Sequence, residues 1–150
     1  MRYFEDMTVG EIRRFGEYRV TREEVVDFAR RYDPQPFHLS DEGAAQTHFG
    51  KLAASGWHTC AMTMSMMVAD FHDEQQAGLG SPGVDELRFL RPVYPGDTLR
   101  CESELLEKRE SRSRPDIGSL RTAIRTFNQD DVQVMGFIGI SLIRRRPDPA

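Results

Sequence analysis

The amino-acid sequence predicts a single α+β domain in which an antiparallel sheet curls around one long buried helix. Three observations lead to this fold class. Residues 52–69 contain no Asp, Glu, Lys or Arg, which is typical of a helix buried on most sides. Residues 84–145 divide into four segments of strand length, and short connections favour antiparallel neighbours. The chain of 150 residues suits one domain, which we expect to span residues 1–150.

A strand and two helices are predicted before the long helix. Residues 11–20 mix apolar and polar side chains in a strand-like pattern. Thr21 and Glu24 have the spacing of a capping box, and apolar residues follow at helical spacing for about three turns. The prolines in residues 33–36 end this helix, and Ser40 begins a second one that stops at residues 49–50.

The long helix and four strands complete the predicted order. Ser55 is a plausible cap for the helix, which should end before the glycine-rich residues 77–83. The nearly continuous apolar character of residues 132–143 predicts a central strand covered on both sides. The predicted strands are residues 84–93, 98–108, 119–128 and 132–145.

Composition disfavours several classes of function. There are 20 Lys and Arg against 24 Asp and Glu, a net charge of −4, so the chain should not attract nucleic acid. Its two cysteines form no CxxC pair, and the first residues lack the apolar core of a signal peptide, so we expect a cytoplasmic protein with reduced thiols. Residues 52–69 also carry too many polar side chains to suit lipid, so no membrane association is expected.

Asp33 and His38 are the first candidate catalytic residues, because a rigid loop holding a carboxylate and an imidazole could bind one water between them. Gly56 is the second candidate, because unpaired N–H groups at a helix start suit a carbonyl oxygen that gains negative charge. Each residue also has an ordinary structural interpretation: a helix-capping Asp, a half-buried His and a packing glycine.

Three motifs resemble those of the MaoC-like dehydratases, which are relatives of the (R)-specific enoyl-CoA hydratases. They are residues 32–38 (YDPQPFH), 49–56 (FGKLAASG) and 89–99 (FLRPVYPGDTL), in the family's order. The resemblance covers nearly the whole chain and implies the hot-dog fold, a long central helix wrapped by an antiparallel sheet. That fold agrees with the element order predicted from the residues alone.

The resemblance implies roles for individual residues. The family's hydratase motif has the form D-x-N-P-x-H, whose Asp and His match Asp33 and His38 and hold the catalytic water. The glycine of its following motif matches Gly56, whose amide would bind the thioester carbonyl. Two positions depart from the pattern, because Gln35 stands where Asn is usual and Ser55 where His is frequent.

Five flanking residues are expected to contact substrate: Gln35, Phe37, Ser55, Trp57 and His58. For His58 a packing role is the alternative, and the helical methionines are expected in the core rather than around an acyl chain. No close His, Cys and Asp cluster indicates a metal site. The arginines of residues 108–114 could contact coenzyme A phosphates or simply face solvent.

The function implied is a hydro-lyase acting reversibly on an enoyl-CoA or (R)-3-hydroxyacyl-CoA type thioester in fatty acid metabolism. Coenzyme A would be part of the substrate, and no separate cofactor is expected. Two alternatives stay open: a hot-dog acyl-CoA thioesterase and a non-catalytic acyl-thioester binding subunit. Because a single sheet leaves its edges exposed, we expect a homodimer or a dimer-based higher oligomer.

Overall fold

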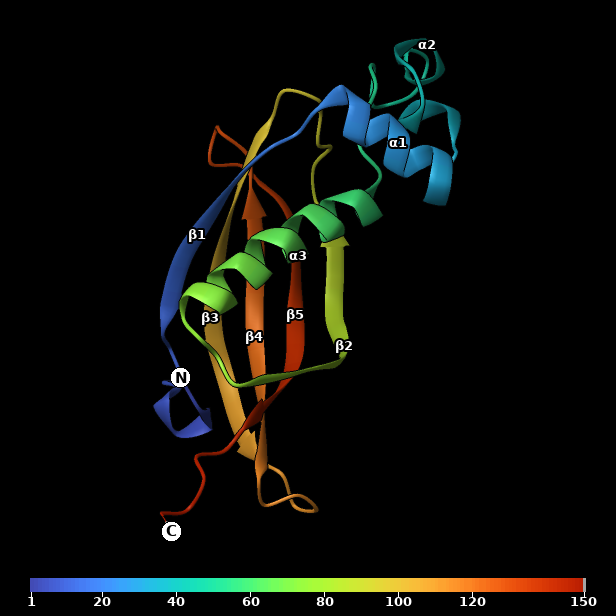
Figure 1. Cartoon of the computed structure of the whole chain (residues 1–150). Coiled ribbons are helices and arrows are strands. Elements are labelled where there is room, and N and C mark those ends of the chain that lie inside the picture. The colour runs from blue at the N-terminus through green and yellow to red at the C-terminus, as the bar shows by residue number, and fades with distance from the viewer. Residues whose placement is uncertain (150) are drawn as a thin grey trace.

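The computed structural model describes residues 1–149 and has the predicted order of elements (Figure 1). A strand and two helices precede the long helix, and four strands follow it. The elements are η1 (Phe4–Asp6), β1 (Ile12–Arg19), α1 (Arg22–Tyr32), η2 (Pro36–His38), α2 (Asp41–Ala44), α3 (Gly56–Asp73), β2 (Gly78–Phe89), β3 (Thr98–Glu110), β4 (Ile117–Phe127) and β5 (Gln133–Arg144).

The five strands form one antiparallel sheet in the order β1-β3-β4-β5-β2, and α3 lies across one face of it (Figure 1). The predicted α+β hot-dog architecture is therefore confirmed. α1 and α2 lie at one end of the molecule, whereas η1 and the turn between β3 and β4 lie at the other end. Within the described residues, no helix is both long and apolar enough to cross a bilayer.

Three predicted boundaries were wrong. β2 ends at Phe89 rather than at residue 93, ahead of Pro92. β2 begins at Gly78 rather than at residue 84, because the glycine-rich segment pairs with β5 through an irregular register that no apolar alternation reveals. α2 has only four residues and ends at Ala44, well before Gly50. β5 is an interior strand as predicted, but only one of its faces lies toward α3, and residues 138–142 are half-buried.

The caps of α1 and α3 lie where the sequence placed them. Thr21 Oγ1 accepts a hydrogen bond from the Glu24 N–H at 3.3 Å, which satisfies one of the unpaired donors of α1. The expected return bond of the capping box is replaced, because the Glu24 carboxylate accepts from the Tyr18 hydroxyl at 2.8 Å. Ser55 caps α3 by accepting from the Trp57 N–H at 3.3 Å.

α3 buries an apolar face that also contains one polar pair. Met62 and Met66 pack into the core against Leu99 and Met135 of the sheet. The hydroxyl oxygens of Thr63 in α3 and Thr126 in β4 lie 2.8 Å apart, and both residues are fully buried. Each hydroxyl therefore satisfies the other where water cannot reach.

Replacing Thr63 with Val should leave the Thr126 hydroxyl buried without this partner and lower the free energy of unfolding by about 1–3 kcal/mol. The double variant Thr63→Val/Thr126→Val removes both polar groups and should lose clearly less than the sum of the two single changes. Urea denaturation of the three variants measures this. Strict additivity of the two single effects would contradict a paired role for the hydroxyls.

His58 joins α3 to α1. Its ring stacks on Phe28 with centroids 4.8 Å apart and planes within 11°, and the residue is only 5% exposed. Within residues 1–149, His58 Nδ1 is buried and has no hydrogen-bond partner. Burial lowers the pKa of His58, and the negative charge of Glu24 only partly opposes this effect. The neutral imidazole is thus the form that the fold favours.

A His whose pKa is lowered on folding destabilises the protein as the pH falls, because the unfolded chain takes up the proton first. Stability should be complete above the ordinary His pKa of about 6.5 and should decline below it. His58→Phe keeps a ring against Phe28 and should reduce this decline. Denaturation between pH 7.5 and 5 measures it, with His72→Ala, at an exposed position of α3, as the control. Identical declines for the parent and His58→Phe would refute this origin.

Candidate active site

The first part of the site is the loop between α1 and η2. Asp33 caps the C-terminus of α1, where its N–H donates to the carbonyl of Ala29 at 2.9 Å. Pro34 and Pro36 then stiffen the chain, and Pro36 begins the short helix η2 that carries His38. The short, proline-containing loop therefore places the Asp33 carboxylate and the His38 imidazole close together.

Asp33 and His38 face each other across the site. His38 Nε2 lies 3.5 Å from Asp33 Oδ2, and the imidazole is nearly fully buried. His38 Nδ1 lies 2.7 Å from the carbonyl oxygen of Ala53, which can only accept, so Nδ1 carries a proton. In neutral His38 the unprotonated Nε2 therefore faces a carboxylate oxygen. Two acceptors so placed require a shared proton or a hydrogen-donating molecule such as water between them.

Two further side chains hold the Asp33 carboxylate. Gln35 Nε2 donates to Oδ1 at 2.6 Å, and the Ser55 hydroxyl donates to Oδ2 at 2.7 Å. Burial raises the pKa of the Asp33 carboxyl, but these two hydrogen bonds and the neighbouring His38 outweigh it, so the pKa lies below its usual value. Asp33 is therefore ionised at neutral pH.

The N-terminus of α3 supplies the second part of the site. The N–H of Trp57 bonds to Ser55 Oγ, and the N–H groups of His58 and Thr59 bond to the Ser55 carbonyl. Within residues 1–149, the Gly56 N–H has no such acceptor. It lies at the positive end of the helix dipole and is available to a carbonyl oxygen.

Phe89, the last residue of β2, covers Gly56. A Cβ atom on Gly56 would lie 2.6 Å from the Phe89 ring, so only glycine allows this approach. The Trp57 ring meets the Phe89 ring edge-on with centroids 6.0 Å apart, and both side chains are at least half exposed. The two aromatic rings form an apolar wall beside the free amide.

The three motifs that carry the family resemblance meet in space at this site. The Ala53 N–H donates to the carbonyl of Phe37, which ties the second motif to the first. The Tyr94 hydroxyl donates to the carbonyl of Phe49 at 2.8 Å, and the Ala54 N–H donates to the carbonyl of Val93 at 2.8 Å. These hydrogen bonds hold the loop of His38 and the start of α3 against the connection between β2 and β3.

Of the predicted site residues, Gln35 and Ser55 donate hydrogen bonds to Asp33. His38 faces Asp33 at 3.5 Å, and Gly56 directly follows Ser55. Phe37 packs edge-on against the His38 ring at 4.7 Å. His58 instead lines a pocket of about 250 Å³ between α1 and α3, together with Tyr18 and Phe28. The predicted substrate contacts of these residues stay predictions.

Sequence reasoning missed the roles of Ala53 and Phe89. The carbonyl of Ala53 fixes the tautomer of His38, and no side-chain pattern could reveal a backbone contact. Phe89 is the first residue of the third motif, and this position in the sequence could have indicated that its ring lies beside Gly56.

Two other features lie apart from this site. Within the described part of the chain, no three His, Cys, Asp or Glu side chains cluster as metal ligands would. A wide hollow of about 630 Å³ lies at the β3–β4 turn. Figure 1 shows this turn at the opposite end of the sheet from α1. Arg109 and Arg114 on its rim are already paired with Glu107 and Asp116, at 2.8 and 2.9 Å.

Comparison with known sequences identifies relatives that match most of the chain. The uncharacterized protein YdeM of Bacillus subtilis is 29% identical over 132 residues, which are 87% of this chain and 90% of that protein. A 3-hydroxybutyryl-CoA dehydratase of Methylorubrum extorquens is 31% identical over 114 residues, which are 75% of this chain and 69% of that enzyme.

Solved structures and family patterns agree with these relatives. A MaoC-like dehydratase from Rhodospirillum rubrum is 36% identical and superposes with a TM-score of 0.87, covering 98% of this chain and 99% of the other. The (R)-hydratase PhaJ1 from Pseudomonas aeruginosa is 27% identical with a TM-score of 0.67, covering 97% of this chain and 86% of the other. The sequence pattern of the MaoC like domain matches residues 6–124, most of the chain. The protein therefore belongs to the MaoC-like family of dehydratases and hydratases.

Proposed function

We propose that the protein catalyses reversible addition of water to an enoyl-CoA thioester, giving an (R)-3-hydroxyacyl-CoA. The single observation that carries this proposal is the pair of facing acceptors, Asp33 Oδ2 and His38 Nε2, 3.5 Å apart. A water molecule bound by this pair would have its hydrogens directed at two acceptors and its lone pairs free to attack carbon.

In this reaction the water oxygen bonds to the β-carbon while the Asp33 and His38 pair takes one proton. The electrons of the carbon–carbon double bond move toward the thioester oxygen, where the Gly56 N–H would stabilise the developing charge. The pair then delivers a proton to the α-carbon, so that protons and electrons balance. One good oxyanion donor contributes about 2.7–4 kcal/mol in other enzymes.

The relatives support the reaction class. The Methylorubrum extorquens protein is named as a 3-hydroxybutyryl-CoA dehydratase, and the Pseudomonas aeruginosa protein as an (R)-hydratase. The first name describes removal of water from a hydroxyacyl-CoA, and the second describes a hydratase. By extension we infer a role in cytoplasmic fatty acid metabolism, with coenzyme A as part of the substrate and no further cofactor.

The decisive measurement is the loss of conjugated-thioester absorbance when purified protein meets a panel of trans-2-enoyl-CoA substrates. Asp33→Asn and His38→Ala should each lower kcat/KM by about 10²–10⁴-fold, because each removes one side of the water site. Asp27→Asn and His72→Ala, at exposed positions of α1 and α3, are matched controls that should keep full activity. Circular dichroism checks that every variant is folded.

Three outcomes would overturn the proposal. Full activity in folded Asp33→Asn and His38→Ala would remove the site assignment. Release of free thiol from saturated acyl-CoA, with no hydration, would indicate the thioesterase alternative. Tight binding of enoyl-CoA without turnover across the panel would indicate a binding subunit.

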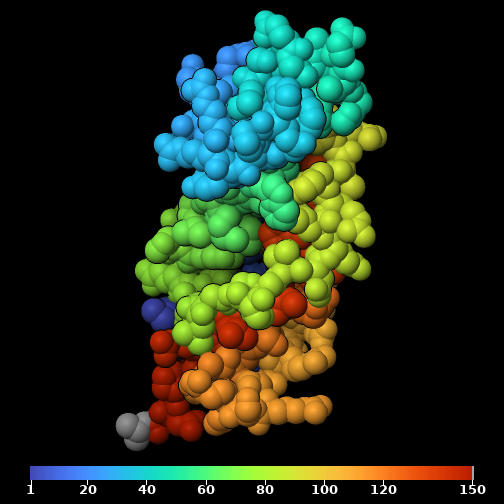
Figure 2. Space-filling view, turned by 90° about the vertical axis from the view of Figure 1, so that its right-hand side faces the viewer, coloured from blue at the N-terminus to red at the C-terminus, as the bar shows by residue number. Residues whose placement is uncertain are grey.

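We further propose that a second copy of the chain covers an apolar surface formed by α3 and β2. We define this apolar edge patch by its exposed side chains, which are Trp57, Met64, Val68, Leu79, Val84 and Phe89. Figure 2 shows both α3 (green) and β2 (yellow-green) on this face of the molecule, with part of β5 (red) visible between them. β2 is an edge strand with free backbone groups, which favour pairing with another strand.

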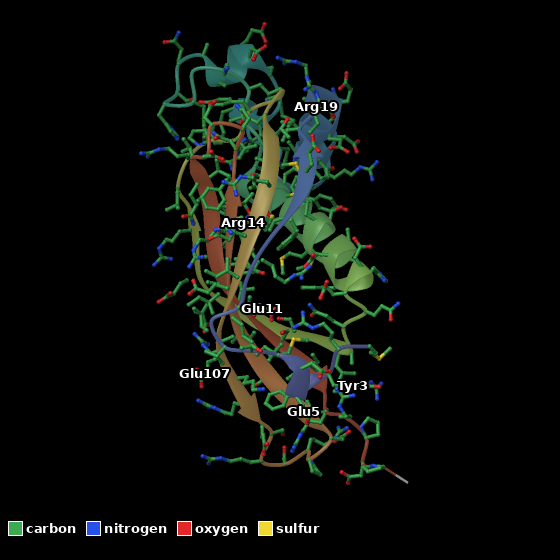
Figure 3. The ribbon with its side chains drawn as sticks, turned by 90° about the vertical axis from the view of Figure 1, so that its left-hand side faces the viewer. Tyr3, Glu5, Glu11, Arg14, Arg19 and Glu107 are labelled. Carbon is green, nitrogen blue, oxygen red and sulfur yellow. The ribbon has the colours of Figure 1, made fainter. Side chains whose placement is uncertain are left out.

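The opposite edge of the sheet is protected against such pairing. Glu11, Arg14 and Arg19 project along β1 and the residue before it, and charged edges resist strand addition. Figure 3 shows this edge facing the viewer. β2 also carries charged side chains, at Asp85, Glu86 and Arg88, so the assignment of the interface to β2 rests on the apolar edge patch.

Light scattering should find a dimer for the parent protein. Val68→Glu places a charge in the apolar edge patch and should shift the population toward monomer. Val9→Glu, at another exposed valine outside the patch, is the matched control and should leave the dimer intact. A monomeric parent, or a dimer unaffected by Val68→Glu, would count against this interface.

A further inference from the structure

We propose that Ser55 is a positioning residue, which orients the Asp33 carboxylate in addition to capping α3. This inference rests on the proposed hydration and deepens it, because it assigns Ser55 to the carboxylate rather than to direct substrate contact. The observation behind it is that a single side chain connects the two parts of the site.

The direction of the Ser55 hydroxyl follows from its partners. Ser55 is fully buried, so solvent offers it no alternative. Its oxygen accepts from the Trp57 N–H at 3.3 Å, and a backbone N–H can only donate. The one proton of the hydroxyl is therefore left for Asp33 Oδ2, which lies 2.7 Å away. The one hydroxyl proton is therefore used within the site, and full burial keeps the oxygen from direct contact with a substrate.

The orientation of Asp33 depends on this bond. Oδ2 is also the oxygen that faces His38 Nε2, while Gln35 holds Oδ1 at 2.6 Å. With a donor on each oxygen, the carboxylate cannot rotate about its last bond without losing a charge-assisted hydrogen bond. Ser55 thereby selects which lone pairs remain available between Asp33 and His38.

Ser55 also sets the distance between the water site and the carbonyl site. It immediately precedes Gly56, whose free N–H is the proposed oxyanion donor. Its hydroxyl donates a hydrogen bond to the Asp33 carboxylate of the water site. The hydrogen bond from Ser55 to Asp33 therefore holds the Gly56 N–H and the Asp33 carboxylate at a fixed separation, so that both can act on the same substrate molecule. Misplacement of such groups by about 1 Å can cost about 10²-fold in rate.

Three substitutions separate the capping role from the positioning role. Ser55→Ala removes both. Ser55→Asp keeps a good capping oxygen but has no proton to donate at neutral pH and sets a second negative charge beside Asp33. Ser55→Thr keeps the hydroxyl and both hydrogen bonds. Thr21→Ala, which removes the cap of α1 without touching Asp33, is the control for cap loss alone.

Enoyl-CoA hydration should discriminate among these variants. Ser55→Ala and Ser55→Asp should lose about 10–10²-fold in kcat with KM within about twofold of the parent, and the acid limb of the pH profile should move to higher pH. Ser55→Thr should retain kcat within about threefold, and Thr21→Ala should keep the parental pH profile. If Ser55→Asp proved as active as Ser55→Thr, capping alone would explain Ser55 and the proposal would be wrong.

A second readout does not depend on turnover. The Asp33 carboxyl carbon can be titrated by NMR in the free protein, where Ser55→Ala and Ser55→Asp should raise its pKa and Ser55→Thr should not. If the parent hydrates no enoyl-CoA, the proposed function fails, while the titration still decides the role of Ser55. An unchanged Asp33 titration in folded Ser55→Ala would overturn the inference even if hydration were observed.

Discussion

The burial of α3 against one face of the sheet is the constraint on which the rest of the structure depends. A helix without charged residues over most of its length is stable in water only if other elements cover it, and the sheet supplies that cover. This burial fixes the position of the helix N-terminus, where the unpaired N–H groups are. One cap, Ser55, then determines which of those groups are satisfied and which one stays free.

The geometry of the site depends on Ser55, because its hydroxyl hydrogen-bonds both to the backbone of α3 and to Asp33. An ordinary capping serine leaves its own proton to solvent, whereas Ser55 is buried and gives its proton to Asp33. Stability of α3 and ionisation of Asp33 therefore rest partly on the same side chain. The partly buried Asp33 carboxylate loses solvation free energy, and hydrogen bonds from Ser55 and Gln35 offset that loss.

Much of the fold could be predicted because its determinants are local. Thr21 and Ser55 are caps that the sequence shows directly, and Asp33, His38 and Gly56 stand in motifs of fixed spacing. The early start of β2 and the place of Phe89 could not be predicted in this way. Both depend on register breaks in β2, including Glu86 at a φ of +55°, and these arise from pairing with β5 rather than from alternation of side chains.

Phe89 connects the proposed interface to the proposed chemistry. Its ring packs on Gly56, and it also belongs to the apolar edge patch together with Trp57. A second copy that covers this patch would restrict both rings and exclude water from the side of the free amide. Hydrogen bonds strengthen when water is excluded, so dimer formation and stabilisation of the thioester oxygen would reinforce each other. We therefore interpret the exposed rings of Trp57 and Phe89 as the side of the site that the second copy of the chain would cover.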